Sequence, residues 1–467
     1  MAGEKSVASP RVRCFLARMA LPGWPHLALA LACLPLASAA EEIPRGEVVE
    51  RIVCAKTPDQ AYALYVPAAY DPARPWPVLL CFDPGARGRV PVERFAAAAE
   101  KFGWIVAGSL NSRNGPWPAN AAAITALLQD LPQRFTLDRR RVYAAGLSGG
   151  ARVACQLALS GKLIRGVVAC SAGFPGSQAP DEVPFALFGT AGVEDFNYVE
   201  LRRLDAELDQ HRATHRVEIF NGGHEWLPAL LAEQALAWFE LQAMRAGVRP
   251  RDEAFISAQL AARHAAVPAQ PVEDNYRALK SLAADFKNLA DTAELETQVA
   301  ALAASRDVRA ALKAERTRLD REDELSREIF SLADDGSVKA MQKEAAKLRA
   351  QADAPADSPE RRMARRVIGG VAQSAREGVR ALFDQRDYGA AAAHLELVAA
   401  LRPDRPQTFF DLARAYALGG DQKRALAALQ QAAALGFKDA ARLGAEPAFE
   451  KLRRAPAFQQ LAAAMAP

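Results

Sequence analysis

Short apolar runs alternate with longer helix-like segments through the first half of this chain, and this alternation limits its fold more than any other feature. Strand-like runs and helix-like segments alternate at residues 77–82, 92–102, 104–108, 119–131, 142–145, 166–171, 184–189 and 217–220. Such alternation is typical of a mostly parallel sheet with helices on both faces. We therefore predict an α/β domain over residues 46–247.

The sequence Gly146-Leu-Ser148-Gly-Gly150 follows one of these strand-like runs and precedes a helix-like segment. A G-x-S-x-G sequence in this setting is typical of a nucleophile elbow, a sharp turn that exposes a serine hydroxyl at the start of a helix. The turn needs small neighbours because the strand and the helix approach closely. Ser148 is therefore the candidate nucleophile, and a chance pattern of small residues is the alternative.

A serine nucleophile needs a base that accepts its proton and an acid that orients the base, in the chain order Ser, Asp or Glu, His. Of six histidines, His224 follows the strand-like run 217–220 and a glycine turn, whereas the others lie in the leader, in a polar stretch or in the helical second half. Asp195 follows the preceding strand-like run and is the candidate acid. Glu194 is the alternative acid. The alternative to a catalytic role, for either residue, is a helix N-cap or a solvated loop charge.

Residues 46 to about 245 resemble a compact α/β hydrolase of the esterase group that includes polyhydroxybutyrate-depolymerase-like and feruloyl-esterase-like enzymes. The resemblance is carried by Tyr62-Ala-Leu-Tyr-Val-Pro, Tyr70-Asp-Pro, Trp76-Pro-Val-Leu-Leu-Cys-Phe-Asp-Pro-Gly85, Gly146-Leu-Ser-Gly-Gly150 and Gly222-Gly-His-Glu-Trp226. It covers under half of the chain. Asp83-Pro84-Gly85 replaces the usual His-Gly, and the acid motif, often Gly-x-x-Asp, carries Gly192 at its fourth place with Asp195 three residues later. The resemblance implies ester cleavage through an acyl-enzyme, without a cofactor.

An oxyanion hole needs backbone N–H groups directed at the developing alkoxide. Gly149 follows the nucleophile, so the elbow geometry makes its N–H one donor. The second donor is expected in the loop after residue 82, where Pro84 has no N–H and Gly85 is preferred over Ala86. An ordinary Pro-Gly turn is the alternative for Gly85.

A polar loop follows the strand-like run 104–108 and contains Asn111, Arg113 and Trp117. Polar groups beside an exposed tryptophan at the carboxyl end of a strand suit a substrate-binding wall. Turn geometry alone also favours such residues in loops. About 75 residues separate Ser148 from His224, which leaves little room for a lid and predicts an open, shallow site.

The first 39 residues have the pattern of a signal peptide. Arginines precede an apolar stretch of about ten residues, and Ala37-Ser-Ala39 is a small-residue cleavage site. We therefore predict a periplasmic or secreted protein with no membrane span in its mature form. The leader carries about three of the four net positive charges, so nucleic acid is not an expected partner.

Four cysteines lie beyond the leader, each inside an apolar run: Cys54, Cys81, Cys155 and Cys170. Burial as free thiols is the preferred interpretation, and disulfide pairing in an exported protein is the alternative. No spacing of cysteines and histidines indicates a metal site.

After residue 247 the sequence becomes alanine-rich, charged and helical. We predict a charged helical region over 253–351, a linker over 352–360 and tetratricopeptide-like repeats over 368–467. The repeat rests on an offset of 34 residues that aligns Asp387 with Asp421 and Leu395 with Leu429. The repeats would bind a protein partner, or would only pack on the α/β domain or dimerise.

Together these patterns predict an exported serine hydrolase that acts on a small-molecule or polymeric ester. Two alternatives stay open. The first is a peptidase of the prolyl-oligopeptidase type, which shares the elbow and the order of the triad. The second is an inactive hydrolase fold that serves as a scaffold through its helical repeats.

Overall fold

The computed structural model describes residues 43–176, 178–269 and 271–465. The predicted signal peptide, residues 1–39, lies outside this part of the chain. Within the described part, no helix combines the length and the apolar character needed to cross a membrane.

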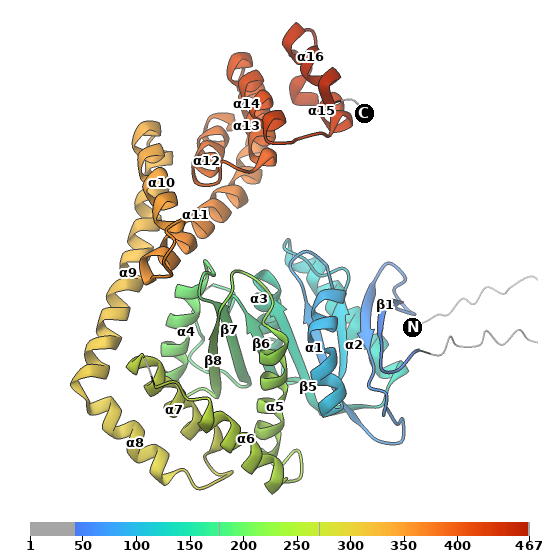
Figure 1. The fold of residues 1–467 in the computed structure, drawn as a ribbon. Helices are drawn as coiled ribbons and strands as arrows, with labels where there is room; N and C mark the ends of the chain where they lie inside the picture. Colours follow the sequence, from blue (N-terminus) through green and yellow to red (C-terminus); the bar gives the residue numbers. More distant parts are fainter. Residues whose placement is uncertain (1–42, 177, 270, 466–467) are drawn as a thin grey trace, which may run out of the picture. The chain divides into compact units, whose positions relative to one another are not determined.

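Eight strands form one sheet in the order β1-β2-β4-β3-β5-β6-β7-β8 (Figure 1). β2 pairs antiparallel with β1 and β4, and every other pairing is parallel. The strands are β1 (Val48–Val53), β2 (Ala61–Tyr65), β3 (Trp76–Phe82), β4 (Ile105–Ser109), β5 (Leu137–Leu147), β6 (Ile164–Cys170), β7 (Ala186–Gly192) and β8 (His215–Phe220). β5 extends beyond the predicted run 142–145. Its first half is arginine-rich and partly exposed, so the sequence there lacks the apolar pattern of a buried strand.

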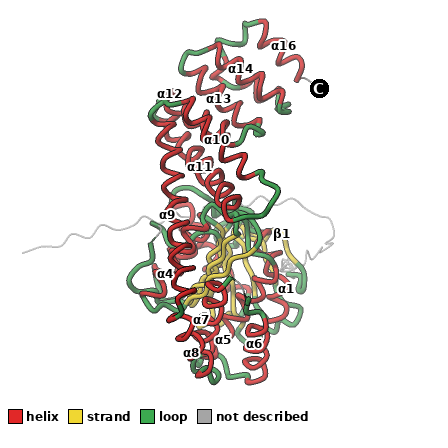
Figure 2. Tube along the Cα trace, turned by 60° about the vertical axis from the view of Figure 1, so that its left-hand side comes forward, coloured by secondary structure: helices red, strands yellow, loops and turns green. Residues whose placement is uncertain are grey.

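Helices lie on both sides of these strands (Figure 2). They are α1 (Arg89–Phe102), α2 (Trp117–Arg134), α3 (Gly149–Leu159), α4 (Tyr198–Gln210) and α5 (Ala229–Arg245). The predicted α/β-hydrolase fold class, a mostly parallel sheet covered by helices and followed by an all-α region, is confirmed.

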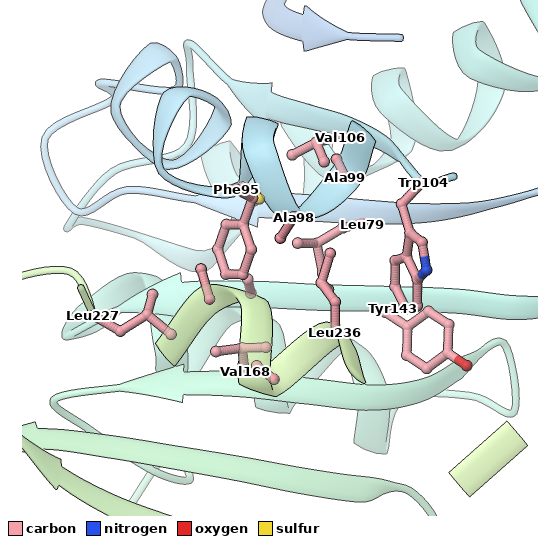
Figure 3. Close-up of a cluster of buried hydrophobic side chains, with 14 of the residues drawn as sticks. Leu79, Phe95, Ala98, Ala99, Trp104, Val106, Tyr143, Val168, Leu227 and Leu236 are labelled. Carbon is pink, nitrogen blue, oxygen red and sulfur yellow. The ribbon is translucent and has the colours of Figure 1, made fainter. Parts of the chain in front are cut away.

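The main core lies between the sheet and the pair α1 and α5 (Figure 3). Phe95 of α1 and Leu236 of α5 are fully buried against strand residues such as Leu79 and Val168. Burying a side chain of this size stabilises the fold by about 1.5–3 kcal/mol. This core holds the strands in register, and their carboxyl ends in turn hold the loops of the site.

All four described cysteines are buried and free, as preferred from the sequence. Burial raises the pKa of the Cys155 thiol to about 12 and that of Cys81 well above its ordinary value. Both thiols therefore stay protonated at neutral pH and behave as small apolar side chains.

The second half of the described chain is helical, and the described residues from Pro44 onward form one compact unit. Its helices are α6 (Glu253–Ala265), α7 (Val272–Phe286), α8 (Ala293–Ala304), α9 (Arg306–Asp334), α10 (Val338–Ala352), α11 (Pro359–Asp384), α12 (Tyr388–Leu401), α13 (Pro406–Leu418), α14 (Gln422–Ala434), α15 (Ala440–Ala445), the 3₁₀ turn η1 (Pro447–Phe449) and α16 (Pro456–Met465). Residues 353–358, inside the segment predicted as a linker, form the connection between α10 and α11.

The 34-residue offset has a local structural counterpart in two helix N-caps. The side chain of Asp387 accepts a hydrogen bond from Ala390 N (3.0 Å), and Asp421 accepts one from Arg424 N (2.9 Å). These caps start α12 and α14, and α13 packs against both helices. The assignment to tetratricopeptide repeats stays a prediction.

Candidate active site

Ser148 occupies a strained turn between β5 and α3. Its φ and ψ are 54° and −121°, a conformation that costs on the order of 1–3 kcal/mol for a residue with a side chain. The flanking glycines make the turn possible. A Cβ atom at Gly146 would lie 2.0 Å from Gly150 O, and one at Gly150 would lie 1.9 Å from Phe82 O. Ser148 directly precedes α3, and the partial positive charge at a helix N-terminus favours negative charge there.

Asp195 and His224 are brought together across the carboxyl ends of β7 and β8. His224 Nδ1 lies 2.8 Å from Asp195 Oδ1, and the Asp195 side chain is fully buried. A carboxylate only accepts hydrogen bonds, so Nδ1 carries the proton and Nε2 is left as the acceptor. The Phe196 ring stacks on the imidazole at a centroid distance of 3.9 Å. The imidazole of His224 is therefore held by Phe196 on one face and by Asp195 at Nδ1.

Backbone contacts between two loops make this pairing possible. Val193 N donates to Phe220 O (2.9 Å), and Glu194 N donates to Gly222 O (3.0 Å). The loops touch so closely that a Cβ atom at Gly192 would lie 2.2 Å from Gly222 O. A glycine is thus required three residues before Asp195.

Glu194, the alternative acid, is directed elsewhere. Its carboxylate pairs with Arg365 of α11 at 2.6 Å. Of the two neighbouring acids, the structure thus brings Asp195 to His224.

Ser148 opens into a cavity of about 560 Å³. In the described part of the chain, no hydrogen bond joins Ser148 to His224. Catalytic hydrogen bonds are often long in a ligand-free site and tighten when substrate binds. Phe196 and Asn197, the two residues that follow Asp195, line the same cavity as Ser148.

The cavity has a second wall that the sequence did not predict. α9 contributes Ser326, Arg327 and Phe330, and α11 contributes Gly370, Val371, Gln373, Ser374 and Glu377. The expectation of an open, shallow site is therefore wrong. The α/β domain has no long insertion of its own, and α9 and α11, which follow this domain in the chain, supply the cover.

The structure places one expected oxyanion donor at the cavity and directs the other away from it. Gly149 begins α3 and lines the cavity beside Ser148. Gly85 N instead donates to Asp83 Oδ1 at 2.8 Å, so in this geometry Gly85 does not serve as the second donor. Ala86 N is also engaged, with Asp83 O at 3.1 Å.

Asp83 organises its own loop. Its buried carboxylate accepts hydrogen bonds from Gly85, from the Arg87 guanidinium and from Trp226 Nε1 at 2.9 Å. Burial alone would raise the pKa of Asp83, but these hydrogen bonds outweigh it and lower the pKa. The residue that replaces the usual histidine therefore ties the loop after β3 to the loop after β8.

Asn114 is a site residue that the sequence reasoning missed. It lines the cavity with Ser148 and Gly149, and a Cβ atom at Gly149 would lie 1.9 Å from its Oδ1. Asn114 N donates to Pro84 O at 2.9 Å, which fixes the backbone of this loop. Oxygen and nitrogen of an amide are assigned from their contacts, so the same group can present N–H donors to the cavity. The one sequence signal was its place before a glycine at the tip of the polar loop.

The other predicted substrate contacts have different surroundings. Asn111 Oδ1 accepts from Ala61 N (2.8 Å) and its Nδ2 donates to Asp59 O (3.0 Å), so its amide holds the loop to β2. Arg113 N donates to the buried Asn120 side chain at 3.0 Å. Trp117 is the first residue of α2 and is 44% exposed. The residues that line the cavity do not include these three.

Within the described residues, no group of three or more histidine, cysteine, aspartate or glutamate side chains is placed to hold a metal ion. The polar side chains that line the cavity are three hydroxyls, three amides and three charged groups: Ser148, Ser326, Ser374, Asn114, Asn197, Gln373, Arg152, Arg327 and Glu377.

No protein-family model and no curated protein match this sequence. Solved structures similar to part of it include a ferulic acid esterase, with 17% identity, a TM-score of 0.34 and coverage of 41% of this chain and 95% of that one. An S-formylglutathione hydrolase (FrmB) from Staphylococcus aureus has 16% identity, a TM-score of 0.32 and coverage of 42% and 96%. An esterase from Pyrobaculum calidifontis has 12% identity, a TM-score of 0.35 and coverage of 43% and 87%. The fold assignment rests on the sheet topology described above.

Proposed function

We propose that this protein is a serine hydrolase that cleaves carboxylic esters through Ser148, His224 and Asp195. The observation that carries the proposal is the 2.8 Å contact of His224 Nδ1 with Asp195 Oδ1, in a structure that also holds Ser148 in a strained turn before α3. A strained, glycine-flanked serine is costly, and such strain clusters at functional sites.

In the proposed reaction, Ser148 Oγ attacks the ester carbonyl carbon while its proton passes to His224 Nε2. Gly149 N–H and the Asn114 amide donate to the oxyanion. The bond to the alcohol breaks, and the alcohol leaves with the proton from His224. Water then attacks the acyl group with His224 again as base, which releases the acid and restores the Ser148 hydroxyl.

The two-sided cavity favours an ester with both apolar and hydrogen-bonding parts. Phe330 and Val371 offer apolar surface, and Arg327 and Glu377 place one charge of each sign on the second wall. Arg152 at the cavity is already committed, because its guanidinium makes two hydrogen bonds to Glu200 (3.0 and 2.8 Å). A volume of about 560 Å³ is in the range of ordinary small-molecule sites.

The proposal includes export and a docking role for the last helices. Export is supported by the leader-like pattern of residues 1–39 and is tested by determining the mature N-terminus from periplasmic and culture fractions. Docking is supported by the 34-residue repeat of capped helices and is tested by capture of a partner on the full chain.

The decisive experiment is hydrolysis of p-nitrophenyl acetate and butyrate by the full protein, with Ser148→Ala and His224→Ala. His211→Ala is the matched control, because His211 caps α4 and its Nδ1 contacts Pro180 O rather than the acid–base pair. Turnover that disappears in the first two variants and persists in the control supports the triad.

Two other outcomes separate the alternatives. Turnover of aminoacyl p-nitroanilides at a rate comparable to esters would support the peptidase. Wild-type protein that hydrolyses neither class, and that does not react with a fluorophosphonate at Ser148, would support the inactive scaffold.

A further inference from the structure

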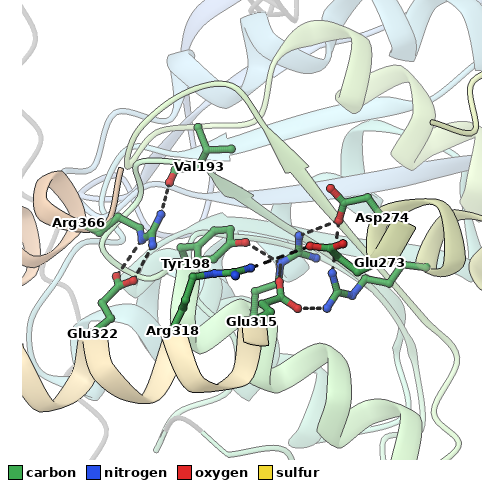
Figure 4. Close-up of polar contacts among 10 residues, drawn as sticks. Val193, Tyr198, Glu273, Asp274, Glu315, Arg318, Glu322 and Arg366 are labelled. Carbon is green, nitrogen blue, oxygen red and sulfur yellow. Dashed lines mark hydrogen bonds and ion pairs between the residues drawn. The ribbon is translucent and has the colours of Figure 1, made fainter. Parts of the chain in front are cut away.

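The loop that carries Asp195 is held from the helical region by a buried arginine (Figure 4). Arg366 of α11 donates through Nη1 to Val193 O at 2.7 Å. The same guanidinium makes two hydrogen bonds to Glu322 of α9, at 2.8 and 2.5 Å, and lies 4.5 Å from the centre of the Tyr198 ring. Val193 precedes the acid by two residues, and Tyr198 follows it by three.

α11 also contacts Phe196, the residue that directly follows Asp195. A Cβ atom at Gly369 or Gly370 of α11 would lie 3.4 Å from Phe196, so the helix backbone lies directly against this ring. Phe196 in turn stacks on His224. The Phe196 side chain therefore links α11 to the imidazole of His224.

We propose that Arg366 is a positioning residue of the active site, which holds the Asp195 loop in the geometry that orients His224. The inference rests on the proposed function, since it assigns a role to the helical region in that same triad. The hydrolase domain thus does not complete its own site: α9 and α11 supply both a cavity wall and the clamp on the acid loop.

The contacts require a guanidinium. Arg366 and Glu322 are 9% and 4% exposed, so both charges are almost fully removed from water. Such burial is retained only with good geometry and with further hydrogen bonds, and the Val193 carbonyl supplies one of them here. A lysine would keep the charge, but its single ammonium lacks the planar fork that reaches two carboxylate oxygens and a carbonyl together.

The test compares Arg366→Met and Arg366→Lys with a control of matched cost, Arg263→Met. Arg263 of α6 also pairs with a largely buried acid, Asp285, at 2.5 Å, but α6 contributes no residue to the cavity lining in the described structure. Each variant is measured as the full chain, for kcat and KM on p-nitrophenyl butyrate and for melting temperature. The third readout is the low-field proton resonance of the hydrogen bond between His224 Nδ1 and Asp195, which needs no turnover.

We expect Arg366→Met to lower kcat by roughly 10- to 100-fold with little change in KM, as for a misplacement of about 1 Å at a reacting group. Arg366→Lys is expected to lose less, and both variants should broaden or shift the low-field resonance. The control should lose melting temperature but keep kcat and the resonance.

Wild-type kcat and an unchanged resonance in Arg366→Met would overturn the inference, and so would an equal loss of kcat in Arg263→Met. If Arg366→Met does not fold, Arg366→Lys decides by the same criteria. Absence of Ser148-dependent turnover in the wild type would sink the proposed function instead. The resonance would still show whether Arg366 holds the Asp195–His224 pair.

Discussion

Replacement of Gly150 by alanine is the sharpest test of the elbow geometry. The added Cβ atom would lie 1.9 Å from Phe82 O and 2.7 Å from Phe82 C, whereas real Cβ atoms essentially never approach closer than 3.0 Å. Both atoms belong to the backbone of β3 and cannot rotate away. The start of α3 must therefore move by about 1 Å from β3, and Ser148 must move with it. A displacement of that size at the nucleophile lowers kcat by on the order of 100-fold.

The assay is steady-state hydrolysis of p-nitrophenyl butyrate, with the rate of fluorophosphonate labelling of Ser148 and a thermal melt beside it. Gly161→Ala is the matched control, because a Cβ atom at Gly161 meets nothing within 4 Å. It should leave kcat unchanged. Gly150→Ala with wild-type kcat, or an equal loss in both variants, would refute the argument from close approach.

Of three further predictions, two concern groups around Ser148 and the third concerns the pH dependence of stability through His215. Asp195→Asn should lower kcat by about 10⁴-fold, because the amide favours the wrong tautomer of the histidine; Glu194→Gln should cost under about fivefold, as for a partly exposed ion pair, and the reverse order would reassign the acid. Asn114→Ala should lower kcat by about 10²- to 10³-fold if its amide is an oxyanion donor, and a change confined to KM would make it a binding residue only. Burial alone lowers the pKa of His215, but the hydrogen bonds to Asp205 and to Ala213 O, together with the charges of Asp205 and Asp209, outweigh it and raise the pKa. The stability lost in His215→Gln should therefore be largest near pH 6 and shrink as pH rises through the folded-state pKa; urea unfolding at pH 6 and pH 9 checks this, and a loss that grows with pH would contradict it.

The second cavity wall changes the role expected of the helical region. From the sequence, these helices were a docking surface or an appendage. In the structure, α9 and α11 line the cavity that Ser148 opens into, and α11 contacts the acid loop. A docking role for α12 to α16 is compatible with this arrangement, because the helical-region residues that line the cavity come from α9 and α11 rather than from those later helices.

The sequence by itself determined the features that depend on local chemistry. The alternation of apolar runs determined the α/β sheet, since each run can bury itself only between helices. The glycines around Ser148 indicated the elbow because only glycine tolerates the close approach of backbone at those positions. The position of His224 after the last strand indicated the base, because the carboxyl ends of parallel strands share one edge of the sheet.

Tertiary structure alone decided the rest, because it depends on contacts between residues distant in the chain. Whether Gly85 N–H was free depended on where the Asp83 carboxylate turned, and that depended on Arg87 and on Trp226, 143 residues later. Asn114 became a site residue, and Asn111 a structural one, through the partners each met in space. The second wall and the Arg366 clamp join the acid loop to α9 and α11, across 173 residues in the case of Val193 and Arg366. No local pattern records such a contact, because the pairing is set by how the helical region packs against the α/β domain.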